Sequence, residues 1–254
     1  MTGALTAKDI YKRYGEIPVL KDVHIDIAPG TTHAVIGPNG AGKTTLFKVL
    51  SGEVFADAGS VEFFGRDVSR MPGHERVRLG IGRTFQVARV FGEMSVLENL
   101  VIALESRARF AHEPGVRHFG VSPSPATQAE ALRILETVEL GGRVGETAAV
   151  LAYGERKRLE LALALALRPR MLLLDEPMAG MSPGDRLGAV ALLKRIAKAQ
   201  DMAILLTEHD MSVVFALADQ VTVLNYGEVI ASGPPEQVRA SPVVREIYLG
   251  HEHA

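Results

Sequence analysis

The 254-residue sequence predicts an α/β fold built on a doubly wound, mainly parallel sheet. Short apolar runs at 33–37, 171–175 and 202–207 are typical of parallel strands that are buried on both faces. A glycine-rich loop and a helical stretch at 43–50 follow the first run, and strand, loop and helix in this order form half of a parallel α/β unit. A helical stretch rich in Ala, Leu and Lys separates the other two runs, as a crossover between parallel strands requires.

Three further segments complete the expected architecture. Residues Val23–Ile27 alternate between apolar and polar, which predicts a half-buried strand. Residues 221–233 form two alternating runs around Asn-Tyr-Gly, which predicts a hairpin. The segment 87–157 is expected to be a mainly helical insertion, with a capping box at Thr127–Glu130 that marks a helix start. The alternative for this segment is an irregular loop over the sheet edge.

The composition excludes several classes of protein. Hydrophobic residues make up 47% and charged residues 23%, values near the globular average that exclude wholesale disorder and fibrous repeats. The net charge of −2 argues against binding nucleic acid through an overall basic field. The absence of cysteine excludes disulfides, thiolate zinc sites and cysteine nucleophiles, so a metal would sit on oxygen or imidazole ligands.

The sequence also bears on the relation to a membrane. The most apolar stretches, at 159–167 and 202–206, are shorter than the roughly 18 residues that a spanning helix needs. The first residues lack the charged start, apolar stretch and cleavage site of a signal peptide. We therefore expect a chain that stays in the cytoplasm and serves a membrane only as a peripheral partner.

The sharpest chemical signal is at Gly37–Thr44, which fits the P-loop pattern G-x-x-x-x-G-K-[ST] between an expected strand and an expected helix. Glycines let such a loop curl so that backbone N–H groups point at phosphate oxygens, and the positive end of the following helix adds attraction. Lys43 would bridge the terminal phosphates, and the Thr44 hydroxyl would ligate Mg²⁺. The candidate nucleotide-binding residues here are Gly37, Asn39, Gly40, Ala41, Gly42, Lys43, Thr44 and Thr45.

A pair of carboxylates ends the apolar run at 171–175. Because ligands of α/β sheets bind at the carboxyl ends of the strands, Asp175 and Glu176 would lie beside the P-loop. Asp175 would hold Mg²⁺ through water, and Glu176 would polarise the water that attacks the γ-phosphate. The alternative is an acidic strand end that faces solvent. His209 follows the next apolar run, so a third parallel strand would bring it to the same edge, and the alternative is a solvated histidine.

These motifs, in this order, resemble the ATP-binding cassette (ABC) ATPases of ABC transporters from about residue 5 to residue 250. The resemblance implies a P-loop NTPase core of the RecA-like type with a mainly parallel sheet, an N-terminal antiparallel β subdomain and an inserted α-helical subdomain. It implies a single ABC ATPase domain over 5–250. Its parts would be a nucleotide-binding core at 1–86 and 159–250, a helical subdomain at 87–158 that carries the signature loop, and a tail at 251–254.

The resemblance also implies roles for single side chains. Tyr14 matches the aromatic residue that stacks on adenine, and Gln86 matches the glutamine that reaches the Mg²⁺ site and contacts the membrane subunit. His209 matches the switch histidine that holds the γ-phosphate. The implied metal ligands are Thr44, Gln86 and Asp175, and the implied catalytic residues are Lys43, Gln86, Glu176 and His209. The alternatives are a surface strand aromatic at Tyr14 and an ordinary loop residue at Gln86.

The segment Leu151–Glu155 matches the signature loop, which in this family closes over ATP bound to the other subunit of a head-to-tail dimer. The residues implied to bind that nucleotide are Ala152, Tyr153, Gly154 and Glu155. The loop departs from the commonest form, LSGGQ, because Ala152 lacks the serine hydroxyl and Tyr153 replaces a glycine. This leaves the Gly154 N–H and the following helix N-terminus as anion donors. Ser182 also departs from the family, since many relatives have aspartate there.

The L-[AS]-Y-G form of the signature loop is similar to the branch of the family that energises branched-chain amino-acid importers. The stretches that agree with that branch are Gly82–Gln86, Val90–Leu100, Glu176–Met181 and Ile247–Gly250. The resemblance implies the larger of two ATPases, with ATP and Mg²⁺ as cofactors, in a heterodimer beneath two transmembrane permease subunits. It would lie on the cytoplasmic face of the inner or plasma membrane, and a periplasmic or extracellular substrate-binding protein would supply the cargo.

Several alternatives stay open from the sequence. The dimer could be a homodimer, and the transporter could import urea or short amides or could belong to a lipopolysaccharide export system. A soluble, non-transport ABC ATPase acting on ribosomes or DNA is the alternative from another class. Such proteins usually carry two cassettes or a long coiled-coil insertion, which this sequence lacks, and the charge of −2 offers no footprint for a polyanion. We therefore expect no nucleic-acid partner.

Overall fold

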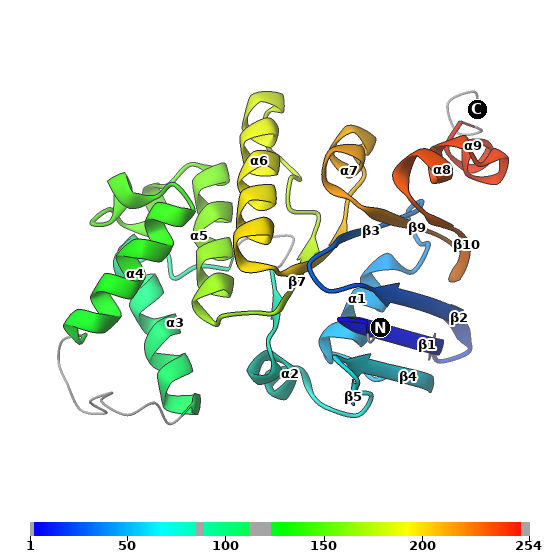
Figure 1. Ribbon diagram of the computed structural model, residues 1–254, viewed down its shortest axis with the longest axis horizontal. Helices are drawn as coiled ribbons and strands as arrows, with labels where there is room; N and C mark the ends of the chain where they lie inside the picture. Colours follow the sequence, from blue (N-terminus) through cyan, green and yellow to red (C-terminus); the bar gives the residue numbers. More distant parts are fainter. Residues whose placement is uncertain (1–2, 85–88, 112–122, 250–254) are drawn as a thin grey trace.

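The protein is described from a computed structural model, which defines residues 3–84, 89–111 and 123–249. Its strands form two sheets (Figure 1). The antiparallel sheet has the order β2-β1-β4-β5, with β1 (Leu5–Tyr14), β2 (Ile17–Ile27), β4 (Ala58–Phe63) and β5 (Arg66–Asp67). The second sheet has the order β10-β9-β3-β8-β7-β6, with β3 (Thr32–Ile36), β6 (Ile81–Arg83), β7 (Met171–Asp175), β8 (Ala203–Thr207), β9 (Gln220–Asn225) and β10 (Glu228–Gly233).

The second sheet is parallel except at the β9–β10 hairpin. The helices of the described residues are α1 (Lys43–Ser51), α2 (Gly73–Leu79), α3 (Val96–Ala111), α4 (Pro125–Thr137), α5 (Tyr153–Ala166), α6 (Pro183–Gln200), α7 (Met211–Leu217), α8 (Pro235–Ala240) and α9 (Pro242–Leu249), with 3-10 turns at Gly141–Arg143 and Ala148–Val150. The predicted α/β class, mainly parallel sheet, antiparallel β subdomain and helical insertion are confirmed.

The parallel sheet separates two cores, because side chains along a strand point alternately to its two faces. On β7, Met171 and Leu173 join the core that includes α1 and the antiparallel sheet. Leu172 and Leu174 join the core that includes α5, α6 and α7. α1 therefore lies between the two sheets, as Figure 1 shows. This layering buries both faces of the parallel strands and leaves their ends free to carry a site.

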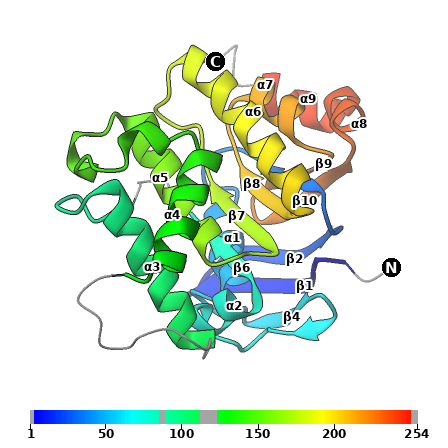
Figure 2. The same cartoon turned by 60° about the vertical axis from the view of Figure 1, so that its left-hand side comes forward.

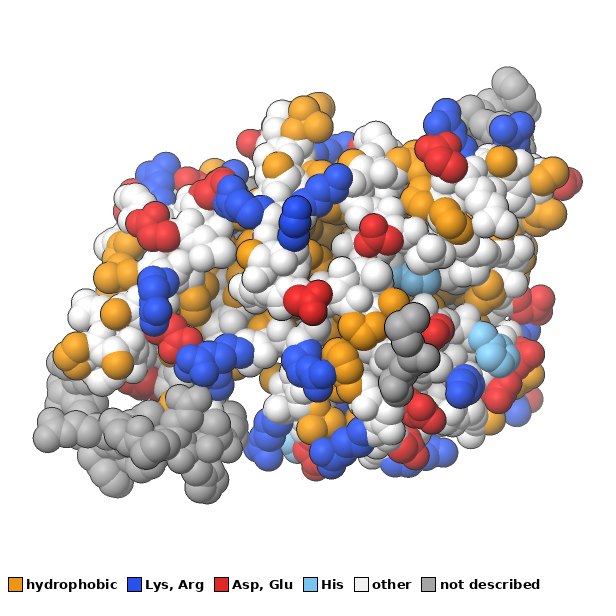
Figure 3. Space-filling model, in the orientation of Figure 1, with side chains coloured by type: hydrophobic (Ala, Val, Ile, Leu, Met, Phe, Trp, Pro, Cys, Tyr) orange, Lys and Arg blue, Asp and Glu red, His pale blue; other side chains and the backbone are white. Residues whose placement is uncertain are grey.

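The helical insertion forms a separate cluster of α3, α4 and α5, which lie together in Figure 2. Leu100, Leu104, Leu135 and Leu159 are buried where these helices meet. The expected division between residues 158 and 159 falls inside α5, whose C-terminal half packs on the parallel sheet. In the described part of the chain, we find no helix with the length and apolar character that crossing a membrane requires. On the face drawn in Figure 3, acidic and basic side chains are interspersed.

The expected capping box at Thr127–Glu130 is wrong. α4 begins at Pro125, and Ser124 is its N-cap, because the Ser124 hydroxyl accepts a 3.1 Å hydrogen bond from the Thr127 N–H. Proline suits the first helical position, since its fixed φ matches the helix and it has no N–H to satisfy. Glu130 instead pairs with Arg107 of α3, with two N–O distances of 2.9 Å.

Candidate active site

The P-loop connects β3 to α1, as the sequence predicts. Gly37, Gly40 and Gly42 all have positive φ angles, of 154°, 79° and 105°. A Cβ atom on Gly37 would overlap the Leu224 carbonyl oxygen of β9, so only glycine fits between the loop and the neighbouring strand. The loop leads directly into the first turn of α1. The N–H groups of that turn have no partner within the helix, and together with the helix dipole they attract anions.

Lys43 is the first residue of α1 and is buried. Its Nζ donates to the Gly37 and Pro38 carbonyls of the loop, at 2.6 and 3.0 Å. Burial lowers the pKa of Lys43, and the negative charges of Glu176 and Asp175 oppose that shift. The lysine is thus a partly desolvated donor that lies within the electrostatic reach of both carboxylates.

Asp175 and Glu176 end β7 and are fixed by the adjacent strand β8. The Thr207 hydroxyl donates to Asp175 Oδ1 at 2.8 Å, and the Glu176 N–H donates to the same hydroxyl at 3.1 Å. Arg83 Nη2 lies 3.9 Å from Asp175 Oδ2. Glu176 has a φ of 47°, the left-handed conformation that non-glycine residues rarely adopt. The chain therefore leaves the extended conformation of β7 at Glu176.

His209 follows β8 and meets Glu176 directly, with 2.5 Å between Nε2 and Oε1. The Glu176 side chain is 19% exposed and that of His209 is 50% exposed, so the pair lies at the surface of the site. Sequence reasoning missed the neighbouring Glu208, whose carboxylate accepts from the Met178 N–H at 2.9 Å and from the His209 N–H at 3.2 Å. Burial raises the pKa of Glu208.

One pocket unites the P-loop with this pair. Its lining residues are Val19, Asn39, Gly40, Ala41, Gly42, Lys43, Thr44, Thr45, Glu176 and His209. The structure thus brings together most of the predicted residues, and it adds Val19, which β2 carries past the loop. Gly37 lies at the base of the loop, and Asp175 is joined to the site through Thr207. The pocket combines backbone donors, a cation, two threonine hydroxyls and the Glu176 carboxylate, with Asp175 behind it. This set suits a polyphosphate and the oxygen ligands that Mg²⁺ prefers.

Tyr14 is another predicted residue that does not line this pocket. Tyr14 ends β1, is 47% exposed and lies beside Lys12, whose Nζ is 5.7 Å from the ring centroid. It lies one short turn before β2, the strand that carries Val19. Gln86 lies outside the described residues, so its predicted roles stay predictions.

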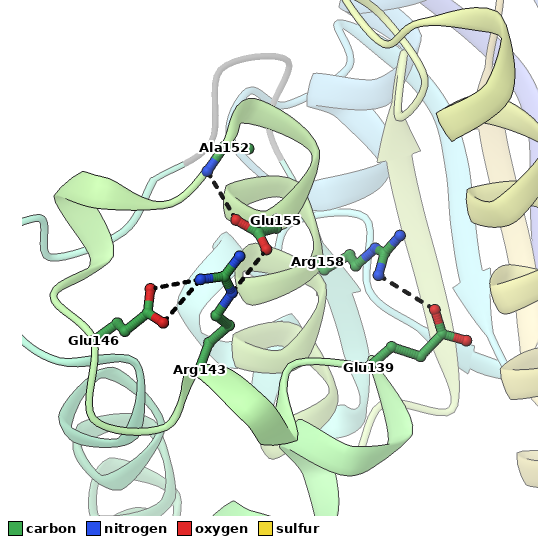
Figure 4. Close-up of polar contacts among 6 residues, drawn as sticks. All are labelled: Glu139, Arg143, Glu146, Ala152, Glu155 and Arg158. Atoms are coloured by element: carbon green, nitrogen blue, oxygen red, sulfur yellow. Dashed lines mark hydrogen bonds and ion pairs between the residues drawn. The ribbon is translucent and has the colours of Figure 1, made fainter.

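The signature loop lies apart from this pocket, at the start of α5. Glu155 Oε2 accepts from the Ala152 N–H at 2.9 Å, and Glu155 Oε1 accepts from Arg143 Nε at 3.1 Å (Figure 4). Arg143 also binds Glu146, at 2.8 Å. The Glu155 carboxylate is therefore occupied within the subunit. Ala152 has no side-chain group that could cap the helix, which leaves first-turn N–H groups available for an anion.

Comparison with known proteins agrees with this geometry. The ABC transporter family matches residues 20–179, and the branched-chain amino acid ATP-binding cassette transporter family matches residues 228–254. The chain is 35% identical to the high-affinity branched-chain amino acid transport ATP-binding protein BraF of Pseudomonas aeruginosa, over 97% of both chains. It is 34% identical to the lipopolysaccharide export system ATP-binding protein LptB of Acidithiobacillus ferridurans, over 99% of both. Among solved structures, the ADP conformation of MJ1267, an ATP-binding cassette of an ABC transporter, superposes with a TM-score of 0.86 at 31% identity, over 98% of this chain and all of that one.

Proposed function

Because the chain belongs to the ABC transporter family of ATP-binding proteins, we propose that it is the ATP-hydrolysing subunit of an importer for branched-chain or other hydrophobic amino acids. The observation that carries the catalytic part is the single pocket that joins the P-loop to Glu176 and His209. The cargo rests on the branched-chain family match at residues 228–254 and on the similarity to BraF.

The chemistry of hydrolysis follows from these groups. With ATP bound, Lys43 would exchange its two loop carbonyls for oxygens of the terminal phosphates. His209 would turn from Glu176 toward the γ-phosphate, which frees a carboxylate oxygen of Glu176 to accept a proton from the attacking water. Mg²⁺, which would neutralise phosphate charge, would be held by Thr44 and, through water, by Asp175. Gln86 is the third predicted ligand.

The separation of the signature loop from the P-loop pocket supports a head-to-tail dimer of ATPases. The uncapped start of α5 offers backbone donors to an anion, yet none of the residues that line the pocket comes from 152–155. In a dimer, these donors would reach the nucleotide held by the second ATPase subunit. We infer a heterodimer, with a homodimer as the alternative.

A groove lined by Arg83 and Arg89, which flank the predicted glutamine in the sequence, supports docking of the permease. It is mostly apolar and lies between α3, α5 and the segment that begins at Arg89. Phe91 and Ile102 are 54% and 37% exposed at its edge, and Leu163 lines its wall. Two transmembrane permease subunits would each cover such a groove, one on each ATPase. The chain would then lie at the cytoplasmic face of the inner or plasma membrane, and a substrate-binding protein would act only indirectly, from the other side.

The substitution Glu176→Gln tests the proposed function. We expect the variant to bind ATP but to lose steady-state turnover by at least about a hundredfold, because glutamine cannot accept the proton of the attacking water. Glu236→Gln on the exposed face of α8 is the matched control and should keep full turnover. Near-normal turnover in Glu176→Gln would show that Glu176 does not accept the proton of the attacking water.

Uptake identifies the cargo. Host cells that lack the gene receive the wild type or Glu176→Gln, and labelled leucine, isoleucine, valine and urea are compared. Uptake of the three amino acids that depends on Glu176 supports the importer. The similarity to LptB makes lipopolysaccharide export the second candidate, and failure of all four substrates despite ATP binding would favour it.

A further inference from the structure

An aromatic ring of the signature loop rests on the loop that follows the catalytic carboxylates. Tyr153 is the first residue of α5, and Gly180 lies between β7 and α6. Gly180 has a φ of 75°, and a Cβ atom added there would lie 3.2 Å from Tyr153 Cε1 and 3.4 Å from Cζ. Carbon atoms prefer separations of about 3.5–4.0 Å. The ring therefore packs closely on the Gly180 backbone, and a methyl group at this position would require the ring to shift by a few tenths of an ångström.

Hydrogen bonds continue from this contact to the catalytic pair. The loop is folded into two turns, since the Ala179 N–H donates to the Glu176 carbonyl at 3.1 Å and the Met181 N–H donates to the Met178 carbonyl at 3.2 Å. Its centre is held by the buried carboxylate of Glu208, which accepts from Met178 at 2.9 Å and from the His209 N–H at 3.2 Å. The segment between Glu176 and Gly180 is thus bound both to the switch histidine and to the ring of Tyr153.

We propose that Tyr153 is a positioning residue for hydrolysis, which sets the 176–181 loop through Gly180 and so holds Glu176 and His209 in their working arrangement. The proposal rests on the proposed function, since the signature loop would meet the nucleotide of the partner subunit. When the signature loop moves on binding that nucleotide, the Tyr153 ring would transmit the movement to the Glu176 carboxylate of the same subunit. A double-mutant cycle measures this coupling directly.

A double-mutant cycle on the full-length chain provides the measurement. Gly180→Ala in the wild type should lower kcat about tenfold, because the new methyl group displaces the ring in addition to straining the backbone, and the strain is common to every background. In the Tyr153→Ala background, which has no ring to displace, Gly180→Ala should lower kcat by less than about threefold. In the Tyr153→Phe background, which keeps the ring, Gly180→Ala should again lower kcat about tenfold. Within each Tyr153 background, Gly180→Ala should change the KM for ATP by less than about twofold, because it alters neither the P-loop nor the signature loop.

Gly184→Ala is the matched glycine control. It lies in the first turn of α6, and a Cβ atom there would meet no heavy atom within 4 Å, so kcat should be unchanged. Circular dichroism establishes that each variant is folded, and binding of a fluorescent ATP analogue reports the P-loop separately from turnover. Equal penalties for Gly180→Ala with and without the ring, or a rise in KM that accounts for the loss, would overturn the role of Tyr153. A wild type that neither binds nor hydrolyses ATP would overturn the proposed function itself.

Discussion

Replacing Arg76 with methionine should strongly destabilise the protein, because this arginine closes the end of the P-loop helix. Arg76 lies on α2 and is 1% exposed. Its Nη1 donates to the Val49 and Leu50 carbonyls in the last turn of α1, at 2.8 Å each. The Val49 carbonyl also accepts from the Gly52 N–H at 3.2 Å, whereas the Leu50 carbonyl belongs to the last helical positions, which have no partner within the helix. Its Nε and Nη2 donate to the carbonyls of Met71 and Ser69, at 2.8 and 3.3 Å.

The size of the effect follows from the carbonyls that lose their donor. Methionine fills much of the same volume but donates no hydrogen bond, so loss of the donor at the Leu50 and Met71 carbonyls costs about 1–3 kcal/mol each, or about 2–6 kcal/mol together. Replacing the arginine also removes a buried charge, and the desolvation cost recovered in this way offsets part of the loss. We therefore expect the free energy of unfolding to fall by about 3 kcal/mol. For a chain of this length, that loss corresponds to a fall in Tm of about 6–12 °C.

Urea unfolding followed by circular dichroism measures this loss on the full-length chain. The matched control is Arg66→Met, at an exposed position of β5, which should change the free energy of unfolding by less than about 0.5 kcal/mol. ATP affinity should fall with Arg76→Met, since α1 begins at Lys43 and carries the P-loop donors. A free energy of unfolding within about 1 kcal/mol of the wild type would refute the claim that these carbonyls need the arginine.

Two further substitutions test the fold. Burial lowers the pKa of His33 to about 4, and its Nε2 lies 2.8 Å from the Thr222 hydroxyl. The unfolded chain protonates this histidine near pH 6.5, whereas the folded chain protonates it only near pH 4. The free energy of unfolding should therefore be highest above pH 6.5 and fall by about 3 kcal/mol between pH 6.5 and 4. His33→Gln should flatten this slope in pH-dependent urea unfolding. Ser182 caps α6 by accepting from the Asp185 N–H at 3.2 Å, so Ser182→Ala should cost about 1 kcal/mol in the same assay. Ser182→Asp should keep the cap, and an equal loss in both variants would exclude capping as the cause.

The parallel strands and the P-loop could be predicted because their signals are local. Each buried strand is a short continuous apolar run, and the glycine spacing of the loop is legible without knowledge of its neighbours. The convergence of Glu176 and His209 could also be predicted, since both follow parallel strands and such strands end at one edge. The helix start at Ser124 could not be fixed as easily. Ser124 and Thr127 are both good caps, and the choice depends on Pro125 and on the pairing of Glu130 with a distant arginine.

The residues that were missed act through contacts that are distant in sequence. Glu208 accepts from Met178, 30 positions away, and its isolated position after an apolar run does not identify that partner. Val19 lines the pocket because β2 passes the P-loop, a register that no local pattern reveals. Arg76 reads as one charge of a short polar helix, although it is almost fully buried. Long-range packing, more than local propensity, decides each of these roles.

The two positions at which the predicted signature loop departs from the common LSGGQ form each have a compensating contact within the subunit. Ala152 removes a cap from α5, but the Glu155 carboxylate accepts from the Ala152 N–H and is itself held by Arg143, so the helix start stays ordered (Figure 4). Tyr153 adds a ring where the common form has none, and the ring is accommodated by Gly180, which has no side chain to obstruct it. A change at Tyr153 or Gly180 alone should therefore disturb the 176–181 loop, through which the signature loop contacts the segment that carries Glu176. For this reason, restoring the common sequence at Ala152 and Tyr153 without considering Gly180 is expected to lower turnover instead of raising it.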